Sequence, residues 1–146
     1  MGFFYGAFAQ SQGFDGHETQ KLAHNKVYYH LLGTEEKEDI LIQENTEPKD
    51  YRFSVKVTHD GKYALLFKTL NGSNREKRLM IAELLDNPAK KELQWQTLFG
   101  EKFKKVGLIE YVHNIGTKFY LRTNYKASNQ RLIMIDLATF DSENPK

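Results

Sequence analysis

Five histidines are the residues in this sequence best suited to acid–base catalysis or metal binding: His17, His24, His30, His59 and His113. No pair of them has the three- to five-residue spacing that sets two ligands on one face of a helix, and the chain contains no cysteine to complete a site. Each histidine falls in a segment that predicts a strand or a turn, where an exposed or hydrogen-bonded imidazole is the usual case. We therefore predict no metal, no cofactor and no catalytic histidine.

Serine and acidic residues offer the other candidates for catalysis. Ser73 and Ser128 would each need a nearby base and an oxyanion hole to act as nucleophiles, but both lie in polar segments typical of turns. The acid pairs Glu35-Glu36 and Glu38-Asp39 have the residue types of a general acid and a general base. Because they directly follow Gly33-Thr34, we interpret them as the solvated tip of a hairpin. The chain is thus expected to carry no catalytic residue.

Charge and composition exclude several classes of partner. Lys102, Phe103, Lys104 and Lys105 interleave charge and aromatic character as nucleic-acid binders do, but 21 basic residues are balanced by 19 interspersed acidic ones, for a net charge of +2. No apolar run approaches the ~20 residues of a membrane span. Hydrophobic residues make up 40% and aromatic residues 13%, which is typical of a globular, β-rich chain. We expect no nucleic-acid or membrane partner and, without cysteine, a cytoplasmic location.

The strongest pattern is an internal repeat. Three segments begin with a basic residue and continue as an apolar strand, and their starts at Lys26, Arg78 and Arg131 are 52 and 53 residues apart. A second element of three apolar residues precedes each of them in the same order: Phe3-Phe4-Tyr5, Ala64-Leu65-Leu66 and Phe119-Tyr120-Leu121. A period of this length is typical of proteins built from stacked sheets, such as β-propellers.

Alternating apolar residues between turn signals predict the strands of each unit. The middle unit, residues 50–100, is expected to be a complete four-stranded antiparallel blade of Tyr51–Thr58, Tyr63–Thr69, Arg78–Leu84 and Gln94–Phe99. The first unit, residues 1–45, lacks its first strand and supplies Phe3–Ala9, Lys26–Leu32 and Ile40–Glu44. The third, residues 104–140, lacks its last strand and supplies Val106–Val112, Lys118–Thr123 and Arg131–Leu137. The predicted fold class is all-β, a partial propeller of about two and a half four-stranded blades.

A propeller blade must be covered by a neighbour on each face because both of its faces are apolar. In this chain only the middle unit has two neighbours. The outer units are expected to expose apolar faces and strand edges. We therefore predict that the isolated chain is unstable or oligomeric.

Several ordered stretches resemble one family closely. Val27–Thr34 reads VYYHLLGT, and it is followed by Glu38-Asp39-Ile40-Leu41, Glu47-Pro48-Lys49 and Asp60-Gly61-Lys62-Tyr63. The third unit continues the pattern with Tyr111-Val112, Asn114, Gly116-Thr117, Phe119, Arg122-Thr123-Asn124, Asn129, Arg131-Leu132-Ile133 and Ile135-Asp136. From Gly2 to Asp136 the chain resembles the seven-bladed propeller of the prolyl oligopeptidases, peptidase family S9A.

The resemblance implies a parent serine endopeptidase that cleaves short peptides after proline, with an α/β-hydrolase domain packed against the propeller. Only the propeller is represented in this chain, since no Gly-x-Ser-x-Gly nucleophile motif is present. Its implied role is to filter substrates by size, without activity of its own. The alternative is a non-catalytic propeller scaffold that binds a protein partner, and a hydrolase encoded downstream would distinguish the two. Whether the parent hydrolyses peptides or joins their ends stays open.

The resemblance also implies two positions that contact the peptide. They lie after Glu47-Pro48-Lys49 and in the turn before the strand that begins at Arg78, which places them at Tyr51 and Ser73. The family has a Trp-Met pair and a Cys at these places, and this chain has an additional residue after Lys49. We expect Tyr51 and Ser73 to tune the preference for residues upstream of proline.

Overall fold

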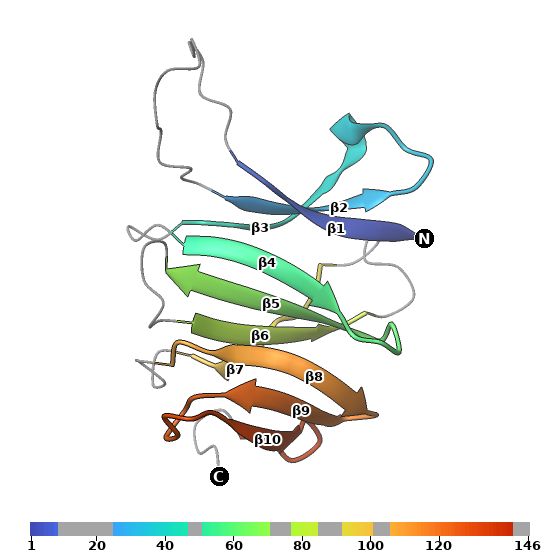
Figure 1. Cartoon of the computed structure of the whole chain (residues 1–146). Coiled ribbons are helices and arrows are strands. Elements are labelled where there is room, and N and C mark those ends of the chain that lie inside the picture. Colours follow the sequence, from blue (N-terminus) through green and yellow to red (C-terminus); the bar gives the residue numbers. More distant parts are fainter. Residues whose placement is uncertain (9–24, 47–50, 71–76, 85–91, 101–105, 142–146) are drawn as a thin grey trace, which may run out of the picture.

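The chain forms three antiparallel sheets that follow one another in sequence order (Figure 1). The computed structural model describes residues 1–8, 25–46, 51–70, 77–84, 92–100 and 106–141. In each sheet, strands adjacent in the sequence pair with one another, as in a meander. Among the described residues, no helix is long and apolar enough to cross a membrane.

The first sheet contains β1 (Gly2–Ala7), β2 (Lys26–Leu31) and β3 (Ile40–Glu44), with the 3-10 turn η1 (Glu36–Glu38) before β3. The middle sheet contains β4 (Tyr51–Val57), β5 (Tyr63–Leu70), β6 (Lys77–Glu83) and β7 (Gln96–Phe99). The third sheet contains β8 (Ile109–Ile115), β9 (Lys118–Thr123) and β10 (Arg131–Asp136). Every strand expected from the sequence is present, and in all but one strand both ends lie within two residues of the prediction.

The first strand of the third sheet is the main correction to the predicted strands. It was expected at Val106–Val112 and lies at Ile109–Ile115. The Val106 carbonyl accepts a hydrogen bond from the backbone N–H of Lys77, at the start of β6, so this residue is bonded to the middle sheet. The strand instead extends to a two-residue turn, in which Gly116 adopts the positive φ of 57° that glycine tolerates.

Both faces of the middle sheet are buried, because side chains alternate along a strand. Leu65 of β5 belongs to a cluster formed with the third sheet, which includes Phe119 and Leu121. Leu66, the next residue, belongs to a second cluster formed with the first sheet, which includes Val27. Both leucines are 0% exposed. The sheets therefore pack face to face in series, with the middle one covered on both sides.

Candidate functional site

Tyr51 opens β4, and its side chain is fully buried. Nη2 of Arg78 donates a hydrogen bond to the Tyr51 hydroxyl oxygen over 2.9 Å. Nζ of Lys68 lies 4.2 Å from the centroid of the Tyr51 ring, and the guanidinium carbon of Arg78 lies 5.1 Å from it. The electron-rich ring thus helps to hold two positive charges within the protein. Whether Tyr51 also influences a peptide stays a prediction.

Ser73, the other expected contact, lies outside the described residues, as do His17, His24 and the basic residues 102–105. Ser128 is exposed in a turn, where the sequence placed it.

A cleft of about 390 Å³ lies beside the two cations, between β3 of the first sheet and the strands of the middle sheet. Lys68 and Arg78 share its described lining with the apolar side chains of Phe53, Leu66 and Met80. That described lining contains no carboxylate, histidine or serine. Its chemistry is that of a binding surface, and it offers no base placed to activate a nucleophile.

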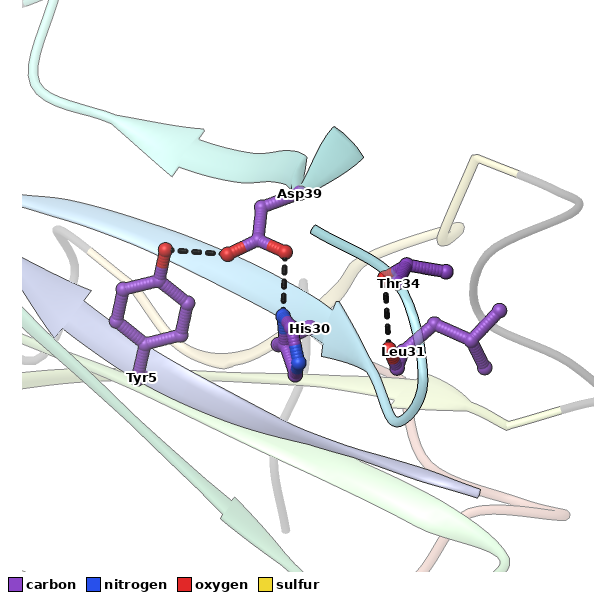
Figure 2. Close-up of polar contacts among 5 residues, drawn as sticks. All are labelled: Tyr5, His30, Leu31, Thr34 and Asp39. Atoms are coloured by element: carbon purple, nitrogen blue, oxygen red, sulfur yellow. Dashed lines mark hydrogen bonds and ion pairs between the residues drawn. The ribbon is translucent and has the colours of Figure 1, made fainter. Parts of the chain in front are cut away.

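A second polar cluster lies on the other face of the first sheet (Figure 2). The hydroxyl of Tyr5 on β1 donates to Asp39 Oδ2 over 2.6 Å, and Nδ1 of His30 on β2 lies 2.7 Å from Asp39 Oδ1. A carboxylate only accepts hydrogen bonds, so the proton lies on the Nδ1 atom of His30. The Asp39 side chain is 4% exposed. The sequence predicted that Glu38-Asp39 belongs to the solvated tip of a hairpin, and for the buried side chain of Asp39 this prediction is wrong.

The contacts of Asp39 shift two pKa values. The hydrogen bond from Tyr5 is the main reason that the pKa of the Asp39 carboxyl lies below its ordinary value, and the bond from His30 lowers it further against the opposing effect of burial. The same bond raises the pKa of Tyr5 to about 12. The cluster is therefore a carboxylate held between a neutral phenol and an imidazole at neutral pH.

This arrangement differs from a catalytic triad. In a triad the nucleophilic hydroxyl faces the imidazole nitrogen that is not bonded to the carboxylate. Here the Tyr5 hydroxyl donates to the carboxylate itself. Within the described residues, no side-chain hydroxyl forms a hydrogen bond with His30. The Thr34 hydroxyl donates to the Leu31 carbonyl over 2.7 Å and closes the turn after β2 (Figure 2). The cluster therefore fixes the connection between β2 and β3.

A polar network also joins the middle and third sheets. Asn114 Nδ2 donates to Asp60 Oδ2 over 2.8 Å, and the Tyr111 hydroxyl donates to Asn114 Oδ1 over 2.5 Å. The Thr58 hydroxyl donates to Asp60 Oδ1 over 2.7 Å and is the main reason that the pKa of Asp60 is lowered. The described parts of the chain contain no group of three or more histidine, cysteine or acidic residues placed to hold a metal ion.

Asn25 forms the corresponding contact between the first and middle sheets. Its side chain is buried, and its Oδ1 accepts a hydrogen bond of 2.6 Å from the backbone N–H of Phe53. Its Nδ2 donates to the Ala7 carbonyl over 3.3 Å. Both interfaces thus combine an apolar core with a directional polar contact.

Comparison with known proteins identifies the relatives of this arrangement. The family model described as "Prolyl oligopeptidase, N-terminal beta-propeller domain" matches residues 1–146. Prolyl oligopeptidase A of Galerina marginata is 40% identical over 112 residues, which is 77% of this chain and 15% of that protein. Prolyl oligopeptidase A of Amanita bisporigera is 32% identical over 142 residues, which is 93% of this chain and 18% of that protein.

Among solved structures, prolyl oligopeptidase B of Galerina marginata, bound to a 35mer hydrolysis and macrocyclization substrate, matches with a TM-score of 0.82 and 26% identity. The match covers 99% of this chain and 19% of that one. The chain therefore spans less than a fifth of the length of these relatives. The predicted fold class, a partial β-propeller, is confirmed.

Proposed function

The chain belongs to the family of prolyl oligopeptidase N-terminal β-propeller domains, and we propose that it forms two and a half blades of a seven-bladed ring in a cytoplasmic serine endopeptidase. The blades are residues 1–45, without a first strand, residues 50–100, which are complete, and residues 104–140, without a last strand. The ring packs against an α/β-hydrolase domain that supplies the catalytic triad. Its role is to admit short proline-containing peptides, which are cleaved after proline, and to exclude folded proteins.

The observation that carries this proposal is the packing of three sheets in series, with both faces of the middle sheet buried. A filter must keep its opening narrow, and so its sheets must resist separation. Buried apolar faces oppose separation of the sheets. The hydrogen bonds from Asn114 to Asp60 and from the backbone N–H of Phe53 to Asn25 also fix the relative register of the sheets. Such a ring would select substrates by size, without taking part in bond cleavage.

We extend the proposal to Tyr51 and Ser73 as determinants of peptide preference. Tyr51 is fully buried, so its influence would be exerted through Lys68 and Arg78, which pack on its ring and line the cleft. Ser73 would contact the peptide from the turn before β6. Replacing each by alanine in a full-length enzyme should change selectivity at positions upstream of proline. Unchanged selectivity in both variants would reject these two roles and leave the size filter untouched.

The size filter can be tested in a chimera. The matching segment of Galerina marginata prolyl oligopeptidase A would be replaced by this chain, and kcat/KM measured for a proline-containing octapeptide and for a folded protein with an exposed proline loop. We expect cleavage of the octapeptide only. Asn114→Ala with Asp60→Ala removes the polar contact between the middle and third sheets, and it should raise cleavage of long substrates relative to the octapeptide.

The matched control is Glu35→Ala with Lys37→Ala. These two side chains are exposed and form an ion pair with each other, and they take no part in the contact between sheets. The control should behave as the unmodified chimera. If loosening the sheets changes kcat/KM for short and long substrates by the same factor, the filter is not in this segment.

A further inference from the structure

The third sheet has an open face that carries large apolar side chains. Leu132 and Met134 of β10 are 61% and 53% exposed. Tyr120 of β9 is the register partner of Met134 and lies on the same face. An exposed group of this kind on a sheet face normally marks a contact surface.

The first sheet has an open face of the complementary kind. Phe3 is 50% exposed, and its ring lies 6.1 Å from that of Tyr5 and 5.2 Å from that of His30. Tyr28 stacks on Tyr5 at 5.6 Å. This face is therefore aromatic.

The sequence repeat indicates what the face of the third sheet contacts. Leu132 and Met134 occupy the positions of Leu79 and Ile81 in the middle unit, each counted from the basic residue that begins the repeat. In the middle sheet these two side chains are 0% and 2% exposed, because they pack in the cluster shared with the third sheet. The open face of the third sheet is thus the equivalent of a face that receives the next sheet.

The same comparison applies to the first sheet. Tyr5 and Tyr28 occupy the positions of Leu66 and Met80 in the middle unit. Leu66 and Met80 pack in the cluster shared with the preceding sheet. The open face of the first sheet is thus the equivalent of a face that packs on the sheet before it, and the two open faces are the two halves of an interface that the chain already forms twice.

We propose that copies of this chain associate head to tail, with the open face of the third sheet of one copy on the open face of the first sheet of the next. The contact places the thioether of Met134 and the side chain of Leu132 against an aromatic surface, a favourable pairing for sulfur. Each face already contains one ion pair, between Lys26 and Glu44 on the first sheet and between Glu110 and Arg122 on the third.

A contact between two different faces is heterologous, so it leaves one open face at each end and extends beyond a dimer. This distinguishes it from a symmetric dimer, in which one face meets its own copy. The proposal concerns the isolated chain of 146 residues, because further blades of the ring proposed above would occupy the same two faces.

Two variants and their mixture test the proposal in sedimentation velocity. The first carries Leu132→Lys and Met134→Lys, and the second carries Phe3→Lys and Leu41→Lys, where Leu41 is exposed on β3 opposite Tyr28. The unmodified chain should form species larger than a dimer as its concentration rises. Each variant alone should remain monomeric. An equimolar mixture should form a dimer and nothing larger, because one intact face of each kind is present.

The control carries the same added charge at Ser54→Lys and Val57→Lys, which are exposed on β4 of the middle sheet and so lie on neither open face, and it should associate as the unmodified chain does. Circular dichroism verifies that each variant is folded, and glutamine replaces lysine at the same positions if a lysine pair lowers the melting temperature. A monomeric unmodified chain, a dimer of either variant alone, or a monomeric mixture of folded variants would each overturn the proposal.

Discussion

Replacing Leu79 by alanine tests the packing of the middle sheet on the third. Leu79 is 0% exposed and belongs to the cluster between these sheets. The substitution removes three carbons, which at about 0.8 kcal/mol each gives roughly 2.4 kcal/mol of lost burial. The cavity left behind raises the expected loss in unfolding free energy to about 3 to 5 kcal/mol.

Leu32→Ala is the matched control, since it makes the same chemical change in the turn after β2. Leu32 is 56% exposed, so the same reasoning gives a loss of about 1 kcal/mol and no cavity. Both variants would be unfolded in urea in the monomeric Leu132→Lys, Met134→Lys background. The fluorescence of Trp95, which packs between the first and middle sheets, reports the transition. Equal losses for Leu79→Ala and Leu32→Ala would refute face-to-face packing.

Three further predictions concern polar residues and turns. The pKa of Asp60 is lowered by the fold, first by Thr58, so its carboxylate stabilises the protein above the unfolded pKa of about 3.9 and this contribution is lost as the pH falls below it. Asp60→Asn should therefore flatten the decline of unfolding free energy between about pH 5 and pH 2.5 in urea titrations; an unchanged slope would contradict this. The phenol of Tyr5 should ionise near pH 12. The difference in ultraviolet absorbance between the unmodified protein and Tyr5→Phe should therefore change near this pH, and a change near pH 10 would contradict the hydrogen bond to Asp39. Because the raised pKa favours the neutral phenol, the stability from Tyr5 is present below pH ~10 and lost toward pH 12. Gly61→Ala, at a φ of +72°, should cost about 1 to 2 kcal/mol in urea unfolding, and a neutral substitution would exclude the positive φ.

The strands and their faces could be predicted because they depend on local alternation. The recurrence that begins at Lys26, Arg78 and Arg131 places β2, β6 and β10 within one residue of their observed ends. The start of β8 could not be predicted in this way. Val106 has the apolar character of a strand residue, but its carbonyl bonds to Lys77, and that partner lies in another sheet.

The polar contacts required information from distant parts of the chain. The burial of Asp39 depends on Tyr5, which lies 34 residues earlier, and an acidic residue beside Glu38 gives no local sign of this. The burial of Tyr51 likewise depends on Arg78, 27 residues later. Buried polar groups need such partners, and a single sequence does not indicate which residues supply them.

The stacking of the sheets in series is tested most directly by nuclear Overhauser effects from two neighbouring leucines. The measurement uses the monomeric Leu132→Lys, Met134→Lys variant. The methyl groups of Leu65 should give cross-peaks to buried side chains of the third sheet, and the methyl groups of Leu66 should give cross-peaks to buried side chains of the first sheet. Cross-peaks from both leucines to the same sheet, or direct contacts between the first and third sheets, would mean that the strands close into a barrel or a two-sheet sandwich.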